Sequence, residues 1–265
     1  MQLPLTIAAA LAAAQRPLVG IWCCSGSPLV AEICAGAGLD WLLIDGEHGP
    51  NDLTTILGHL QAAAAYPVQT VVRVPSNDPV IIKQVLDLGA QNLIVPMVDS
   101  AAQAAAAVAA ARYPSGGIRG VGSALARSAR WNRVEGYLAD ADAHVSVLVQ
   151  IESAAGVEAA TEIAGVDGVD GVFVGPSDLA ASMGLLGQQS HPEVNAAVLR
   201  VFEAVRGQGK PVGVNAFDPA AADAYLAAGA SFVVVGADVT LLARGAEALA
   251  ARFIEQAEQP NQEGY

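Results

Sequence analysis

The residues best suited to chemistry lie between positions 144 and 178, where two acidic residues each follow an apolar run typical of a β-strand. Glu152 ends the run 145–152, and Asp178 follows the run 171–174 and a Gly-Pro-Ser turn. The residues between the runs have a helical pattern, which predicts two parallel strands joined by a helix. The carboxyl ends of parallel strands meet at one edge of a sheet, so both carboxylates are expected at that edge.

The two carboxylates predict a site for a hard divalent cation. Side chains alternate between the two faces of a strand, so Gln150 and Glu152 point the same way, into the predicted site. Neither His nor Cys stands beside the two acids in the sequence. Carboxylate oxygens without nitrogen or sulfur ligands suit Mg²⁺ or Mn²⁺.

A candidate general base follows another apolar run, 41–45. The segment 45–48 reads Asp-Gly-Glu-His. Histidine side chains can take a proton from a hydroxyl near neutral pH, so His48 is the candidate base. A structural loop histidine is the alternative interpretation. The remaining histidines, His59, His144 and His191, are expected to be structural.

Arg73 interrupts the apolar run 70–74. A buried guanidinium needs anionic partners, so Arg73 is expected to meet a substrate carboxylate or a developing oxyanion. A structural pair with Asp45 is the alternative, and both can hold together. Neither lysine ends a strand, because Lys83 lies on a predicted helix and Lys210 precedes a strand, so Schiff-base chemistry is not expected.

Eight apolar, β-branched runs alternate with helical patterns along the chain. They are 18–23, 41–45, 70–74, 92–96, 145–152, 171–174, 211–216 and 231–236. This alternation predicts an α/β fold, a single (β/α)₈ TIM barrel over residues 1–265. An open doubly wound sheet is the alternative, but the phosphate-binding GxGxxG is absent after the first run. Asp218 and Asp238 follow the last two runs, which disfavours a phosphate ester as substrate.

Capping residues mark the expected helix starts, which are Thr6, Asn51-Asp52, Asp78 before Pro79, Ser100, and Asp218 before Pro219. The one irregular region, 112–143, contains five of the 13 basic residues. We expect this insertion at the active face or at a subunit interface. Arginines that pair with an acidic neighbouring surface are the alternative.

Composition limits the possible partners and the compartment. A net charge of -13 disfavours binding to nucleic acid or to an anionic membrane surface. Hydrophobic residues make up 53% of the chain, which supports a large buried core. The three cysteines fit neither a disulfide framework nor a zinc spacing, so a reducing cytoplasm is expected. The Ala-rich start lacks a basic segment, so a helix is favoured over a signal peptide.

The segments DGEHGPND, VRVP, VLVQIES and GVFVGPSDLAASMG occur in this order, and with them the chain closely resembles the HpcH/HpaI aldolases, the class II pyruvate aldolases. The similarity covers nearly the whole chain, including RGVGSALARSARWNR and GADVTLLARGAEALAARF. The resemblance implies a barrel of the phosphoenolpyruvate/pyruvate type and a divalent metal, Mg²⁺, Mn²⁺ or Co²⁺. Family members act on substrates such as 4-hydroxy-2-oxoheptane-1,7-dioate or 2-keto-3-deoxy-L-rhamnonate, in aromatic or sugar acid catabolism.

The resemblance also implies a role for each site residue. Metal ligands are Glu152 and Asp178. Contacts to the ketoacid come from Gln150 and Ser177, within the turn Gly175, Pro176, Ser177 and Asp178. Arg73 stabilises the enolate, and His48 is the base, made more basic by Asp87.

Asp87 is expected in the last turn of a helix that runs away from the active face. A neighbouring subunit's Asp87 is therefore expected to reach His48 more easily than the chain's own. The resemblance implies a homo-oligomer, commonly a hexamer built as a trimer of dimers, with a terminal helix exchanged between barrels. The apolar segment 241–253 is consistent with that exchange.

The predicted activity is the reversible cleavage of a 4-hydroxy-2-ketoacid to pyruvate, or hydroxypyruvate, and an aldehyde. An oxaloacetate-type decarboxylase that reaches the same enolate is one alternative, and a barrel that only binds a ketoacid is another. Specificity for the aldehyde is expected from residues 124–130 and from 215–217, where Asn215 is polar and favours a more hydroxylated aldehyde.

Overall fold

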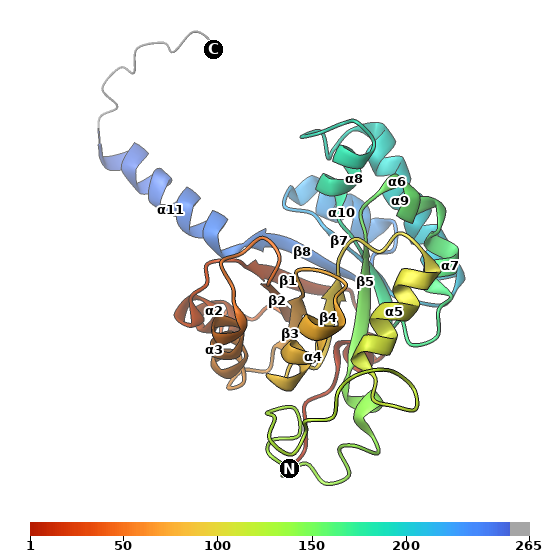
Figure 1. Cartoon of the computed structure of the whole chain (residues 1–265). Helices are drawn as coiled ribbons and strands as arrows, with labels where there is room; N and C mark the ends of the chain where they lie inside the picture. Colours follow the sequence, from red (N-terminus) through yellow and green to blue (C-terminus); the bar gives the residue numbers. More distant parts are fainter. Residues whose placement is uncertain (255–265) are drawn as a thin grey trace.

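Eight parallel strands close into a barrel in the computed structural model, which describes residues 1–254 (Figure 1). The strands are β1 (Leu18–Cys23), β2 (Trp41–Asp45), β3 (Gln69–Arg73), β4 (Asn92–Val95), β5 (Ser146–Ile151), β6 (Gly171–Val174), β7 (Val212–Asn215) and β8 (Phe232–Ala237). Each strand pairs with its neighbours in sequence, and β8 pairs with β1. The structure confirms the (β/α)₈ barrel and excludes the open sheet.

Helices surround the barrel and connect successive strands (Figure 1). They are α1 (Ile7–Ala13), α2 (Pro28–Ala35), α3 (Leu53–Ala63), α4 (Pro79–Asp87), α5 (Ala101–Ala111), the 3₁₀ helix η1 (Ala141–His144), α6 (Ala154–Glu158), α7 (Ala160–Ala164), α8 (Pro176–Ser182), α9 (Pro192–Gly207), α10 (Pro219–Ala227) and α11 (Asp238–Phe253). The predicted caps Thr6, Asp52, Asp78, Ser100 and Asp218 each accept a bond from a first-turn amide. The capping signals are confirmed.

The core has two layers, one inside the barrel and one between the barrel and its helices. Inside, the rings of Trp41, Phe173 and Phe232 pack with centroids 5.7 to 6.3 Å apart. Gly213 leaves the space that the Phe232 ring fills, because a Cβ there would overlap the ring. The interior is therefore a packed core, and ligands can enter only at an end of the barrel.

The insertion 112–143 lies at the amino-terminal end of the barrel (Figure 1). Its residues Arg127 and Arg130 share a cavity with Gln69 and Asn92, which begin β3 and β4. The expectation that the insertion covers the chain's own active face is wrong, because a segment between a helix and the next strand lies at the start of that strand. Its place at a subunit interface stays a prediction.

The last helix, α11, extends away from the barrel (Figure 1). Only Asp238 is buried in this helix, while Leu241, Leu242, Leu249 and Phe253 are exposed. Within residues 1–254, no helix is both long and apolar enough to cross a membrane. The predicted single domain also includes residues 255–265, which lie outside the described part of the chain.

His59 generates a prediction about the pH dependence of stability. Its side chain is fully buried in α3. Burial lowers its pKa below 6.5, so the unfolded state binds a proton more readily than the folded state. Stability is therefore lost as pH falls below 6.5 toward the lowered value.

Replacing His59 with leucine removes the titrating group and fills the buried space with an apolar side chain. We expect the free energy of unfolding of His59→Leu, measured with urea between pH 5 and 8, to fall less steeply on acidification than that of the wild type. Parallel curves for the two proteins would show that His59 does not titrate differently on folding.

Candidate active site

Glu152 lies just past the end of β5 and is buried at 2% exposure. One carboxylate oxygen accepts a bond of 2.8 Å from the Met97 amide, and the other accepts from the side chain of Gln150. Gly175 packs against this oxygen, and a Cβ at position 175 would lie 2.7 Å from it. The predicted common face of Gln150 and Glu152 is thus observed, and both are held rigidly.

The surroundings of Glu152 fit a cation. Its pKa is raised to about 7, mainly by burial and also by the charges of Glu47 and Asp178, although the bonds from Met97 and Gln150 lower it. The Oε1 atom of Gln150 is also buried without a partner among residues 1–254. A positive ion beside Glu152 would relieve the repulsion among these carboxylates.

Asp178 comes from the first turn of α8, and Gly175 is the residue before that helix. Pro176 occupies the first helical position and is buried, whereas Ser177 and Asp178 are exposed. The short strand β6 therefore delivers Asp178 to the same end of the barrel as Glu152. No trio of His, Cys, Asp or Glu side chains in the described part of the chain is arranged to hold a metal, so any ion would need oxygen atoms besides the two carboxylates.

Arg73 ends β3 and is held between two carboxylates. Its Nε and Nη2 atoms donate to the two oxygens of Asp45 at 2.9 and 2.8 Å, and Nη1 lies 2.8 Å from Glu47 Oε2. The guanidinium carbon lies 4.6 Å from the centre of the Trp22 ring. The expected pair with Asp45 is therefore present, and two N–H groups of Arg73 are left for a ligand.

Asp45 stays ionised to hold that arginine. Burial raises the pKa of its carboxyl, but the bonds from Arg73 and Trp22 outweigh burial and leave the pKa below 3.8. The indole Nε1 of Trp22 donates to Asp45 at 2.9 Å. The pair is thus a fixed positive and negative unit at the mouth of the barrel.

His48 stands at the rim, with a side chain that is 66% exposed. Its Nε2 atom lies 4.0 Å from Glu47, and its backbone amide donates to Asp45. Because the imidazole is exposed and adjoins the cavity, it can exchange protons with a ligand and with water.

One cavity of about 290 Å³ collects most of the predicted residues. Its lining includes His48, Arg73, Gln150, Gly175, Ser177 and Asp178, together with Trp22, Cys24, Asp45, Asn215, Phe217, Ala237, Val239 and Thr240. Residues 215 and 217 therefore reach the site, as expected for specificity. Residues 124–130 do not line it in the same chain, because they lie at the opposite end of the barrel.

Asp87 is separated from this cavity. It ends α4, and its Oδ1 atom accepts a bond of 2.9 Å from Arg119, a fully buried arginine of the insertion. Gly89, two residues later, lines the cavity at the amino-terminal end of the barrel. The structure does not bring Asp87 to His48 within one chain, in agreement with the direction expected for its helix.

Several residues of the site were not predicted. Trp22 stacks on Arg73. Asp238, buried at the start of α11, accepts bonds from the amides of Cys24 and Ser25 and so fixes the loop after β1. Met97 has a φ of 54°, and its amide holds Glu152. Asp238 closely follows a predicted strand, and an acidic residue in that position could have marked it as part of the site. Nothing in the sequence marks the backbone amide of Met97.

The closed parallel barrel with carboxylates, an arginine and a histidine at the carboxyl ends of its strands defines the class of protein, an α/β-barrel enzyme. Residues 18–245 match the family model of the HpcH/HpaI aldolase/citrate lyase family. The chain therefore belongs to this family and is an aldolase, an enzyme of the lyase class.

Relatives cover nearly the whole chain. A 4-hydroxy-2-oxo-heptane-1,7-dioate aldolase of Salmonella dublin is 56% identical over 240 residues, which cover 91% of each chain. A crystal structure of a family protein from Burkholderia cenocepacia J2315 has 42% identity and a TM-score of 0.89, covering 93% of this chain and 98% of that chain. The crystal structure of an HpcH/HpaI aldolase from Desulfitobacterium hafniense DCB-2 has 28% identity and a TM-score of 0.83, covering 98% of this chain and 100% of that chain.

The pair of Arg73 and Asp45 generates a stability prediction. Both side chains are buried, at 3% and 2% exposure. Replacing Asp45 with asparagine leaves a buried guanidinium with a weaker partner, so we expect urea unfolding to show a loss of about 3 kcal/mol. Glu158→Gln is the control, because its pair with Arg200 is exposed and its loss should cost less than about 1 kcal/mol. Equal losses in the two variants would contradict a structural role for the buried pair.

Proposed function

We propose that this aldolase depends on a divalent metal and reversibly cleaves 4-hydroxy-2-ketoacids to pyruvate, or hydroxypyruvate, and an aldehyde. The observation that carries the proposal is the buried Glu152, whose pKa is raised to about 7. It lies directly behind Gln150 and Gly175, which line the same cavity as Arg73, His48 and Asp178. The substrate class is favoured by the 56% identical relative, which is named for a 4-hydroxy-2-oxo dioate.

Glu152 and Asp178 would hold the metal, Mg²⁺, Mn²⁺ or Co²⁺. When bound, a divalent ion acts as a Lewis acid that polarises the carbonyl of a ketoacid. Gln150 has a buried Oε1 without a partner among residues 1–254, and with the turn Gly175, Pro176 and Ser177 it would orient the ketoacid. Of these three turn residues, Gly175 and Ser177 line the active-site cavity, and Pro176 lines an adjoining cavity.

His48 and Arg73 would divide the proton transfer and the charge stabilisation. His48 is exposed at the rim, where it would take the proton of the C4 hydroxyl as the C3–C4 bond breaks. The two free N–H groups of Arg73 would stabilise the negative charge that develops on the enolate oxygen. Asp45 and Glu47 hold the guanidinium still, so it need not reorient during the reaction.

The enzyme is also proposed to work as a homo-oligomer, a hexamer of three dimers, in a reducing cytoplasm. The exposed leucines of α11 support an exchange of this helix between barrels. Asp87 lies 2.9 Å from Arg119 at the other end of its own barrel, so it would assist the His48 of a neighbouring subunit. Its carboxylate would then raise the basicity of that imidazole.

Removing the proposed metal ligand tests the cofactor. We expect Glu152→Gln to weaken Mn²⁺ binding, measured by titration calorimetry, by about a hundredfold or more. Replacing a residue that only hydrogen-bonds to a metal ligand usually weakens binding by about 10- to 100-fold, and a direct ligand should matter at least as much. Cleavage of 4-hydroxy-2-oxoheptane-1,7-dioate should fall with it, and a chelator should abolish cleavage by the wild type. Glu162→Gln, on an exposed acid, is the control. Full turnover with chelator present, or inactivation by borohydride with pyruvate, would refute the metal-dependent mechanism.

Replacing His48 separates aldol cleavage from decarboxylation. Cleavage requires removal of a hydroxyl proton, so His48→Ala should lose about 10² to 10⁴ of its turnover. Decarboxylation of oxaloacetate releases CO₂ without that proton, so it should persist in the same variant. If cleavage is unchanged, His48 is not the base; if only oxaloacetate reacts in the wild type, the decarboxylase alternative holds.

A mixture of His48→Ala with a second variant, Asp87→Ala, tests the role of Asp87. Subunits of His48→Ala contain an intact Asp87, and subunits of Asp87→Ala contain an intact His48. The two variant proteins are then dissociated and reassembled together. Some active sites of the mixed oligomer contain both an intact His48 and an intact Asp87 only if Asp87 acts across the interface. Recovery of cleavage in the mixture supports the proposal, and no recovery despite mixed assembly contradicts it.

A further inference from the structure

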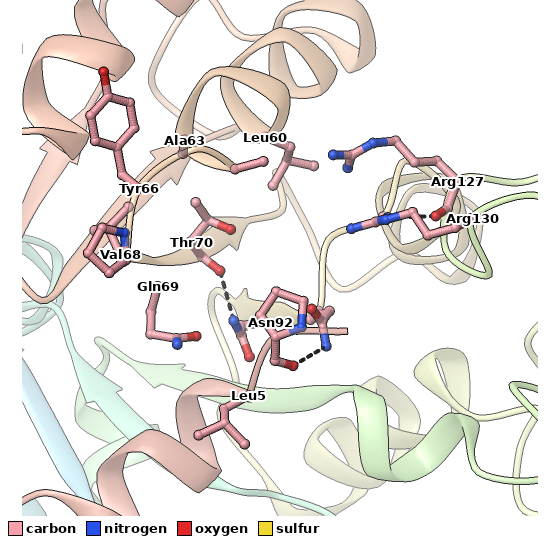
Figure 2. A pocket seen from close by; sticks show the side chains of 15 residues that line it. Leu5, Leu60, Ala63, Tyr66, Val68, Gln69, Thr70, Asn92, Arg127 and Arg130 are labelled. Carbon is pink, nitrogen blue, oxygen red and sulfur yellow. Dashed lines mark hydrogen bonds between the residues drawn. The ribbon is translucent and has the colours of Figure 1, made fainter. Parts of the chain in front are cut away.

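A second cavity lies at the end of the barrel opposite the active site and is lined by two arginines (Figure 2). It has a volume of about 290 Å³. Arg127 and Arg130 come from the insertion, and their guanidinium groups point side by side into the cavity (Figure 2). The opposite walls come from the start of β3, the start of β4 and the end of α3, so the cavity shares no residue with the catalytic mouth.

No acidic residue lines this cavity, although the chain has 26 acidic and 13 basic residues. Among residues 1–254, no carboxylate forms an ion pair with Arg127 or Arg130. Burial and the charge of Arg130 lower the pKa of Arg127 to about 10, and burial also lowers that of Arg130. The two positive charges thus stand together, partly removed from water and without a counterion.

The two guanidinium groups use few of their donors within the protein. The Nη1 atom of Arg127 donates to the Leu88 carbonyl at 2.9 Å, and the Nη1 atom of Arg130 donates to the Arg127 carbonyl at 2.6 Å. Each guanidinium has five N–H donors, so most remain for a ligand. Gly89 leaves the space in which both groups lie, because a Cβ there would be 2.7 Å from each Nη1.

Two polar side chains on the other walls, Asn92 and Gln91, are already engaged. Asn92 donates to the Thr70 carbonyl at 2.8 Å and accepts from the Ile7 amide at 2.7 Å. The amide nitrogen of Gln91 donates to the carbonyls of Pro4 and His144, each at 3.2 Å. Arg127 and Arg130 are the only charged side chains in the lining of this cavity, so they are the groups that select a ligand by its charge.

We propose that this cavity is a binding site for a phosphate group, either inorganic phosphate or a small phosphate monoester. Phosphate carries a charge of about −1.5 to −2 at neutral pH and three or more acceptor oxygens, which match two adjacent guanidinium groups. A single carboxylate would neutralise one arginine and leave the other uncompensated. Leu60 and Ala63 line the far side, which leaves an apolar surface for the organic part of an ester.

The wild-type enzyme with Mg²⁺ provides the first test, through arginine modification by phenylglyoxal and peptide mass spectrometry. Inorganic phosphate at ten times its Kd should slow modification of Arg127 and Arg130 about tenfold at constant ionic strength, because only the free fraction reacts. Arg133, exposed in the same insertion, is the internal control and should react at an unchanged rate. No protection at either arginine would overturn the site.

The ligand class is tested in the same assay. Glycerol phosphate that protects at a lower concentration than inorganic phosphate assigns the site to a monoester, and the reverse order assigns it to the free ion. If malonate, a dicarboxylate, protected Arg127 and Arg130 as effectively as phosphate does, the assignment to a phosphate group would be overturned.

Thermal unfolding of variants provides the second test. Phosphate at a hundredfold excess over Kd should raise the Tm of the wild type by about 5 °C. The rise should vanish in Arg127→Gln/Arg130→Gln and persist in Arg133→Gln. An equal rise in the double variant would place phosphate elsewhere and overturn the proposal. If the double variant does not fold, the protection of the wild type still decides the matter.

Discussion

Closure of the parallel barrel is the constraint on which the site depends. Every strand runs in the same direction, so the residues that follow β2, β3, β5 and β6 meet at one rim although they are far apart in sequence. The packed aromatic interior blocks the passage between the two ends. Within one chain, the cavity at the mouth and the cavity at the opposite end are therefore separate.

Electrostatics at the mouth follow from one buried arginine among several acids. Asp45 and Glu47 flank Arg73, whereas Glu152 has only amide donors and an elevated pKa of about 7. The mouth therefore has excess negative charge close to Glu152 and a fixed positive charge nearby. This asymmetry suits a site that takes a cation and an anionic ketoacid together.

Arginines of the insertion have four different environments. Arg112, at its start, lies 3.8 Å from Asp142 and 3.7 Å from Asp167. Arg119 is fully buried against Asp87, and its guanidinium lies 4.5 Å from the centre of the Tyr113 ring. Arg127 and Arg130 line a cavity with no acid, and Arg133 lies on the exposed Trp131 ring. The sequence suggested one role for all of them, but their neighbours in space decide each role separately.

The sequence alone determined the barrel, the strands and the helix caps, because these depend on local periodicity and on single side chains bonding to nearby amides. It also predicted the convergence of Gln150, Glu152, Asp178, Arg73 and His48, since parallel topology fixes where strand ends meet. Membership of the HpcH/HpaI family then gave the aldolase class.

Tertiary structure alone decided which groups neutralise or oppose one another. The Met97 amide on Glu152, the Trp22 ring on Arg73 and the separation of Asp87 from His48 within one chain all depend on contacts between distant segments. The insertion likewise faces the end opposite the active site. No local pattern encodes such contacts, because burial, the pKa of a side chain and the partners of a charge arise only after the whole chain has packed.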